Sequence, residues 1–166
     1  NALLAEVATT LDRVVILEDT LELNCAAEDC VTLRTKPGLV SLADLVRSTM
    51  RLRPDRIIVG EVRGAEALDM LKAWNTGHPG GLATVHANSA RGALYRIEQL
   101  VQECVVTVPR RLIAEAIDIL VFLEGRGASR KVTEVTRVDS LTLDGDYQLT
   151  PLFSAQTYTS TARSTS

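Results

Sequence analysis

Short apolar runs recur along the first half of the chain, and each is followed by a polar or charged residue. They cover residues 14–17, 57–59 and 82–85. A short run bounded by turn residues is typical of a strand buried on both faces, as in the middle of a parallel sheet. Helical or loop-forming sequence follows each run, so the crossovers leave the strands parallel. The pattern predicts an α/β fold with a mostly parallel sheet flanked by helices.

Between and after these runs, apolar residues recur every three or four positions, which predicts amphipathic helices. The apolar stripes are Leu3, Leu4, Val7 and Leu11; Leu42, Leu45, Val46 and Met50; Ala67, Met70, Leu71 and Trp74; Ala93, Ile97, Leu100, Val101 and Cys104; and Leu112, Ile113, Ala116 and Ile117. Ser41 and Asp44 have the spacing of a capping box at the start of the second helix. Gly77 suits a left-handed cap after the third, and we interpret Trp74 as a packing residue.

The last third of the chain changes character. Residues 119–123 predict a fourth buried strand, whereas residues 132–143 and 147–153 are β-rich and flank a hairpin turn at Asp144, Gly145 and Asp146. Ser and Thr dominate the remainder. We therefore expect a core domain over residues 1–125, a C-terminal β-hairpin over 126–153 and a frayed tail over 154–166.

Chemically useful side chains follow the predicted strands. Glu18 and Asp19 end the first run, Glu61 follows the second after Gly60, and His86 ends the third. In open α/β sheets, ligands bind at the carboxyl ends of the strands. Acids placed there can hold a metal-bound phosphate or orient a water. The alternative for each acid taken alone is a solvated residue at a strand end.

An arginine cluster precedes and follows the second run. Its members lie within 17 residues: Arg47, Arg51, Arg53, Arg56 and Arg63. Ordinary ion pairs at a solvated helix end explain such a cluster. An anion site or a subunit contact explains it equally well, because guanidinium groups suit phosphate and carboxylate recognition.

Composition limits the class of protein. The chain has 166 residues, a net charge of -3 and 46% hydrophobic residues, enough for one domain with a substantial core. There is no general basic field for gripping nucleic acid, and no run long enough to cross a bilayer. The three cysteines, without metal-site spacing, are interpreted as free thiols in a reducing compartment. We expect a cytoplasmic protein, or one peripheral to a membrane.

Three segments together resemble a known family. ILEDTLEL, RLRPDRIIVGEVRGAEALDML and NTGHPGGLATVHANSA are similar to the Asp box, the Walker B region and the His box of the bacterial secretion-ATPase superfamily. Within it, they most resemble type IV secretion and conjugal-transfer ATPases of the TrbB kind, because Thr20 stands where type II secretion and pilus relatives usually carry proline. The resemblance covers roughly residues 1–125.

The resemblance implies a RecA-like P-loop NTPase core, a homohexameric ring and ATP hydrolysis with Mg²⁺. It also implies work with secretion or conjugation machinery at the bacterial inner membrane. Glu61 matches the Walker B acid that polarises the attacking water and supports magnesium through water. Glu18 matches the Asp-box acid that assists it. His78 and His86 match the His-box pair, which lies near the nucleotide. The basic stretch before Walker B contains Arg51, Arg53 and Arg56. The resemblance implies that these arginines contact phosphate or a neighbouring subunit.

Two departures from the family pattern matter. Gly60 stands where many P-loop proteins have an aspartate, and no G-x-x-x-x-G-K-[ST] occurs in the 166 residues. The helix expected over residues 1–11 resembles the one that follows that loop, and the chain begins without methionine. We therefore expect the loop upstream in a longer parent, and an isolated chain that binds ATP weakly without turning it over.

Other readings of the sequence remain open. The first is a non-catalytic, hexamer-forming or scaffold module that keeps the fold and works through protein contacts. The second is a relative of type II secretion or type IV pilus ATPases. The third is a DNA-binding module, for which the arginine cluster is the one supporting feature. We expect no sequence-specific binding of nucleic acid.

Overall fold

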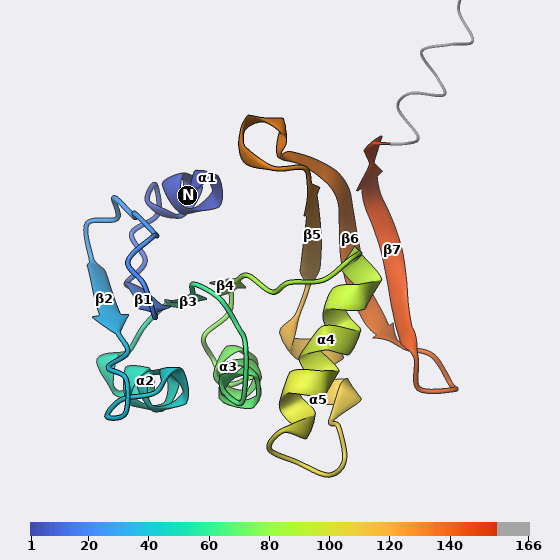
Figure 1. Cartoon of the computed structure of the whole chain (residues 1–166), viewed down its shortest axis with the longest axis horizontal. Coiled ribbons are helices and arrows are strands. Elements are labelled where there is room, and N and C mark those ends of the chain that lie inside the picture. Colours follow the sequence, from blue (N-terminus) through green and yellow to red (C-terminus); the bar gives the residue numbers. More distant parts are fainter. Residues whose placement is uncertain (156–166) are drawn as a thin grey trace, which may run out of the picture. The chain divides into compact units, whose positions relative to one another are not determined.

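The structure of the chain is a computed structural model that describes residues 1–155 (Figure 1). All but the first two positions of the predicted tail lie outside the described residues. The chain divides into two compact units. The first comprises Asn1–Val85 and Gln99–Thr107, and the second comprises His86–Glu98 and the residues from Val108 onward. Among the described residues, no helix is both long enough and apolar enough to span a bilayer.

A parallel sheet forms the centre of the first unit. Its strands are β1 (Val14–Glu18), β2 (Cys30–Arg34), β3 (Arg56–Val59) and β4 (Leu82–Ala83), in the order β2-β1-β3-β4. Every pairing is parallel, as predicted from the crossovers. All residues of β1 are buried, and so is the apolar part of β3. The two central strands are therefore the two-sided core strands that their continuous apolar runs predict.

The strand β4 is shorter than predicted. It ends at Ala83, because the next residue is engaged by the chain that leaves β3. The amide of Val62 donates to the carbonyl of Thr84 at 2.9 Å, and the Thr84 hydroxyl donates to the carbonyl of Gly60 at 2.5 Å. The segment that carries Glu61 is thus tied to the segment after β4.

Helices lie on both faces of this sheet (Figure 1). On one face, α1 (Ala2–Val7) packs Leu4 and Val7 against Val14, Ile16 and Ile58. The opposite face is covered by α2 (Leu42–Thr49), which is followed by the short η1 (Met50–Leu52), and by α3 (Glu66–Asn75). The sheet is therefore covered on both faces, as its buried central strands require.

The first helix is shorter than its predicted range. It ends at Val7, and Leu11, expected on its apolar stripe, is 94% exposed. Thr9 and Thr10 explain the early end, because their hydroxyls donate to the carbonyls of Glu6 and Val7 at 2.7 and 2.8 Å. Threonine side chains that bind nearby carbonyls compete with helix continuation.

The predictions for α2 and Trp74 are confirmed. The Ser41 hydroxyl accepts from the amide of Asp44 at 3.2 Å, and the Ser41 amide donates to the Asp44 carboxylate at 3.0 Å. The Trp74 indole donates to the carbonyl of Ile57 at 3.1 Å. A Cβ atom at Gly81 would lie 2.0 Å from the indole nitrogen, so glycine is required for this packing.

The second unit contains a three-stranded antiparallel sheet in the order β5-β6-β7. Its elements are most of α4 (Ala90–Gln102), α5 (Arg110–Ala116), β5 (Ile119–Glu124), η2 (Gly127–Ser129), β6 (Lys131–Leu141) and β7 (Tyr147–Ser154). The hairpin between β6 and β7 is confirmed, with Gly145 at φ +81° in its turn.

The prediction of a buried fourth strand over residues 119–123 is wrong. β5 pairs antiparallel with β6, and Ile119, Val121 and Leu123 are 45%, 39% and 50% exposed. Its burial alternates, as in a strand with one covered face, although its sequence is continuously apolar. The domain boundary expected after residue 125 falls between β5 and β6, and the two units divide at other positions.

Candidate functional site

The carboxyl ends of β1 and β3 bring Glu18 and Glu61 to one edge of the sheet. The two strands are neighbours, with Leu17 opposite Val59. The amide of Gly60 donates to the carbonyl of Leu17 at 2.9 Å. A Cβ atom at Gly60 would lie 3.2 Å from Cγ of Glu18, so the chain crosses close to that side chain. The departure at Gly60 therefore has a structural reason, because an aspartate would press on Glu18.

Glu18 is buried, with 3% of its surface exposed. Its Oε1 accepts from the amides of Glu22 and Leu23 at 3.0 and 2.8 Å, which fixes the loop after β1. Its Oε2 is buried and has no hydrogen-bond partner within the described part of the chain. Buried carboxylate oxygens are normally satisfied, so this atom is suited to accept a hydrogen bond from a bound water or ligand.

Glu61 follows β3 at this edge of the sheet and is partly exposed. The guanidinium of Arg63 donates to its carboxylate, and the two form an ion pair. This hydrogen bond is the main cause of a raised Arg63 pKa, to which Asp19 and Glu22 add. Three carboxylates, those of Glu61, Asp19 and Glu22, therefore act on Arg63.

Glu66 holds the loop between β3 and α3. Its buried Oε1 accepts from the amides of Arg63 and Gly64 at 2.6 and 2.9 Å. The chain that follows Glu61 is thereby fixed at the start of α3. Sequence reasoning missed this residue, although an acid in the first turn of a helix is a recognisable signal for such a contact.

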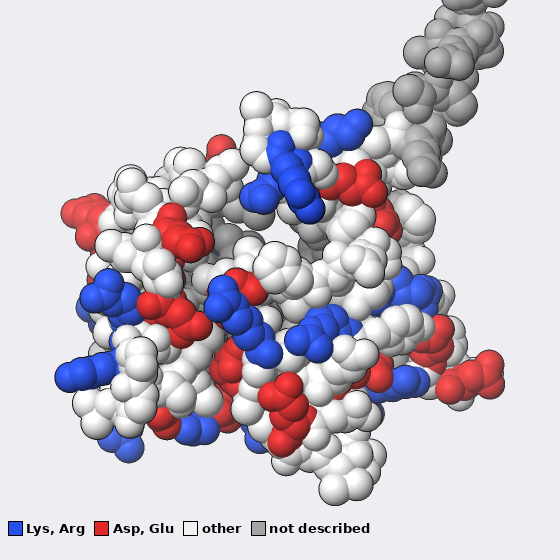
Figure 2. Space-filling model, in the orientation of Figure 1, with Lys and Arg blue, Asp and Glu red and all other residues white. Residues whose placement is uncertain are grey.

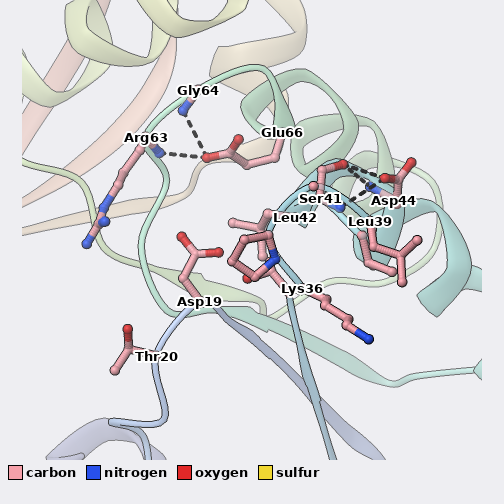
Figure 3. A pocket seen from close by; sticks show the side chains of 14 residues that line it. Asp19, Thr20, Lys36, Leu39, Ser41, Leu42, Asp44, Arg63, Gly64 and Glu66 are labelled. Atoms are coloured by element: carbon pink, nitrogen blue, oxygen red, sulfur yellow. Dashed lines mark hydrogen bonds between the residues drawn. The ribbon is translucent and has the colours of Figure 1, made fainter.

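A cavity of about 830 Å³ opens at the same edge (Figure 3). It lies between the segment that joins β2 to α2 and the loop after β3, and Asp19, Glu66 and Leu42 lie on its walls. Asp44, also on its wall, has a pKa lowered to about 2 by hydrogen bonds from the Ser41 hydroxyl and amide, then by Arg47. Lys36, Ser41 and Asp44, which also line the cavity, were not predicted as site residues.

The arginines expected to contact phosphate or a neighbouring subunit lie at the opposite, amino edge of this sheet. Arg51 and Arg53 are exposed in the turn before β3, and Arg56 is its first residue. Nε of Arg56 donates to Asp12 at 2.5 Å, and Nη1 donates to the carbonyl of Gly80 at 3.2 Å. Because four strand residues span about 13 Å, the structure does not bring these arginines to Glu18 and Glu61.

The two histidines are placed separately. His78 follows α3, and its Nδ1 lies 3.3 Å from the carbonyl of Ala73, on the amino side of β4. His86 begins the second unit and is exposed. Neither histidine lines the cavity. A role for either near a nucleotide stays a prediction.

The acids at this edge do not form a closed metal cage. Among the described residues, no three His, Cys, Asp or Glu side chains come together as a metal site. Mg²⁺ usually keeps several waters and binds few carboxylates beside substrate phosphates. An unpartnered buried Oε2 of Glu18 fits that mode, because it can accept from water rather than bind the ion directly. The cysteines in the described chain are free thiols, as predicted.

Comparisons with known proteins agree with the motifs. Residues 1–123 match the model of the family described as "Type II/IV secretion system protein". The conjugal transfer protein TrbB of Rhizobium radiobacter is 53% identical over 141 residues, which are 84% of this chain and 43% of that protein. The type IV secretion system protein PtlH of Bordetella pertussis is 36% identical over 157 residues, covering 85% of this chain and 46% of that protein.

Solved structures show the same fold. The VirB11 ATPase of the Brucella suis type IV secretion system, in complex with sulphate, matches 75% of this chain and 39% of that one, with 29% identity and a TM-score of 0.67. The Legionella pneumophila ATPase DotB matches 89% and 38%, with 22% identity and a TM-score of 0.58.

The fold prediction is confirmed: the chain has the RecA-like α/β core of these ATPases, with antiparallel strands at its C-terminal end. The chain spans less than half the length of the relatives that it matches. The family match covers most of the chain, and it agrees with the order of the three motifs. The chain therefore belongs to the type II/IV secretion system protein family.

Proposed function

We propose that this chain is the part of an ATP-hydrolysing motor of a conjugative or type IV secretion system that carries the water-activating acids. The observation that carries the proposal is that Glu18, with its buried and unpartnered Oε2, lies at the same sheet edge as Glu61 and close to Gly60, the residue before it. The similarity to TrbB and PtlH favours conjugation or type IV secretion over other uses of the fold.

In this proposal Glu61 orients and polarises the water that attacks the γ-phosphate. Its carboxylate is partly exposed, so it can accept a hydrogen bond from that water. Glu18 assists Glu61 through its buried Oε2, while its Oε1 keeps the loop after β1 in place. Mg²⁺ bound with ATP would neutralise charge on the phosphates. Arg63 holds the Glu61 carboxylate in position until substrate arrives.

The remaining predicted site residues are given roles outside the activation of water. Arg51 and Arg53 are exposed at the amino edge, so we assign them to the nucleotide or surface of a neighbouring subunit in a homohexamer. Arg56 is engaged by Asp12 and Gly80, and its role here is to brace the sheet. His78 and His86 are assigned to sensing the nucleotide state.

The proposed setting is the cytoplasmic side of the inner membrane, with secretion or conjugation proteins as partners. Direct binding of nucleic acid is not proposed. Figure 2 shows Lys and Arg interspersed with Asp and Glu on the visible face, without one extended basic patch. A basic stripe would be expected for a protein that grips the phosphate backbone.

The test is magnesium-dependent ATP turnover by a protein that contains this region together with a phosphate-binding loop. Glu61→Gln should lower kcat by roughly 10²- to 10⁴-fold while ATP still binds, because the amide is a poor base for water. Glu28→Gln is the matched control, since Glu28 is an exposed acid before β2 at the amino edge. Its turnover should match the unaltered protein.

Two outcomes would contradict the proposal. Equal turnover in Glu61→Gln and Glu28→Gln would remove Glu61 from the reaction. A complete protein that neither binds nor hydrolyses ATP would favour the scaffold reading. The 166-residue chain alone contains no G-x-x-x-x-G-K-[ST], so weak ATP binding and no turnover are expected of it.

A further inference from the structure

The turn between β6 and β7 is closed by its own hydrogen bonds. The amide of Thr142 donates to the carbonyl of Asp146 at 2.7 Å, and the amide of Asp146 donates to the Thr142 hydroxyl at 3.1 Å. Gly145 has φ +81°, a conformation that favours glycine. The turn therefore presents Asp146 in one defined orientation.

Asp146 connects this turn to α4. Its Oδ1 accepts from the Tyr95 hydroxyl at 3.1 Å and from the amide of Tyr147 at 2.8 Å. Its Oδ2 accepts from Nη1 of Arg91 at 3.0 Å. The Tyr147 amide is the main cause of a lowered Asp146 pKa, to which Tyr95, Arg91 and Arg110 add. Both carboxylate oxygens are thus engaged.

A second set of contacts supports the same turn from α5. Nη1 of Arg110 donates to the carbonyl of Gly145 at 3.1 Å. The same guanidinium contacts buried Glu98 of α4, through Nη2 at 3.1 Å and Nε at 3.0 Å. Tyr147 is fully buried beside them, and its ring centroid lies 6.2 Å from that of Tyr95. Burial, reinforced by Glu98, raises the pKa of the Tyr147 hydroxyl.

The contacts on α4 follow one helical face. Arg91, Tyr95 and Glu98 are spaced by four and three residues, so they lie above one another along the helix. The turn therefore holds the first turns of α4 rather than a single point on it. Neither the motifs nor the proposed reaction assigns a role to this hairpin.

The start of α4 is linked to the His box. The Ser89 hydroxyl accepts from the amide of Gly92 at 2.9 Å, which caps the helix. His86 lies three residues before Ser89, and Arg91 lies two residues after it. A displacement of the first turn of α4 would therefore move the segment that carries His86.

We propose that Asp146 is a positioning residue for the His-box segment. Through Arg91 and Tyr95 it fixes the start of α4, and with it the backbone that presents His86. The C-terminal hairpin is then a brace for the His box. The functional importance of His86 rests on the proposed ATPase function, whereas the mechanical link does not.

The test uses the full 166-residue chain and NMR of its imidazole protons. The chain has two histidines, and His78, in the first unit, is an internal reference. In Asp146→Ala, the His86 signal should shift or broaden while the His78 signal stays unchanged. Amide exchange across residues 90–98 should rise roughly tenfold, because the acceptors for Arg91 and Tyr95 are lost.

Matched variants separate positioning from general destabilisation. Asp144→Ala alters an exposed acid in the same turn and should leave both signals unchanged. Asp146→Asn keeps an oxygen acceptor and should restore most of the His86 signal. Tyr95→Phe removes one hydroxyl and should reproduce part of the effect, even if Asp146→Ala fails to fold.

Two results would overturn the inference. One is an unchanged His86 signal in both Asp146→Ala and Tyr95→Phe. The other is an equal change at His78 and His86, which a purely structural role would produce. Because no nucleotide is present, either result is independent of whether the complete protein hydrolyses ATP.

Discussion

The two edges of the parallel sheet carry charges in different arrangements. At the amino edge, cations and anions pair with one another: Arg56 with Asp12, and Arg13 with Asp29. The backbone amide of Arg13 also donates to the carboxylate of Asp55. At the carboxyl edge, Arg63 pairs with Glu61 beside Asp19 and Glu22, and a buried oxygen of Glu18 has no hydrogen-bond partner in the described structure.

In the proposed function, the amino edge is a supporting edge and the carboxyl edge is the working edge. Paired charges at an edge satisfy each other and need no ligand. A buried carboxylate oxygen without a partner costs stability, and a bound water or ligand is a common reason for such an atom in a native structure. We therefore interpret the carboxyl edge as the site from the unpartnered oxygen of Glu18 and its place beside Glu61, rather than from the number of charges.

Gly81→Ala should give the largest loss of stability, at the supporting edge. The new Cβ would lie 2.0 Å from the Trp74 indole nitrogen and would displace its hydrogen bond to Ile57. Overpacking together with a lost hydrogen bond predicts about 2 to 4 kcal/mol, measured by urea unfolding. Gly77→Ala, where space is open but φ is +98°, should cost about 1 kcal/mol. Equal costs would contradict the packing role of Trp74.

Glu18→Ala tests the working edge, with an expected cost of about 1 to 3 kcal/mol. The variant leaves the amides of Glu22 and Leu23 without their acceptor. Glu18→Gln keeps an acceptor and should cost less, while ATP turnover in a complete protein should fall in both. Urea unfolding beside turnover measurements separates the two roles. A more stable Glu18→Ala protein would show that burial of Glu18 outweighs its hydrogen bonds.

Much of the working edge could be predicted from sequence. The runs that become β1 and β3 are short, apolar and bounded, and their burial on both faces leaves one parallel arrangement. Glu18 ends β1, and Glu61 follows β3 after Gly60. The parallel order of the two strands is therefore enough to predict that these side chains lie at the same edge. Glu66 was missed because the apolar stripe of α3 was considered without the acid in its first turn, which accepts hydrogen bonds from backbone amides.

The supporting edge could not be predicted in the same way. Arg51, Arg53 and Arg56 stand close to Glu61 in sequence, but a strand separates them from it. Sequence proximity across a strand places residues on opposite edges of the sheet. The antiparallel pairing of β5 with β6 was missed for a related reason. An apolar run alone does not tell which sheet a strand joins.

Acid should weaken both edges through different aspartates. Hydrogen bonds from Ser41, then Arg47, lower the pKa of Asp44 to about 2, and Arg56, then Thr10, lower the pKa of Asp12. Because the folded pKa lies below the ordinary aspartate pKa of 3.8, the stabilisation is present above that value and is lost as pH falls toward 2. Asp44→Ala should flatten the dependence of the unfolding free energy on pH in this window. Glu28→Gln should leave it unchanged, and an unchanged slope in Asp44→Ala would contradict the assignment.

Asp29→Asn should give the smallest effect. The ion pair between Arg13 and Asp29 is 2.9 Å long, with side chains 44% and 50% exposed, so its contribution at low salt is about 0 to 1 kcal/mol. Salt near 1 M should remove it, because the screening length is then only about 3 Å. Asp12→Asn provides the contrast, since the pair with Arg56 is only 28% and 32% exposed. Its cost should be larger and should persist in salt. If both variants lost their effect equally on addition of salt, the amino edge would be a solvated surface rather than a support for the sheet.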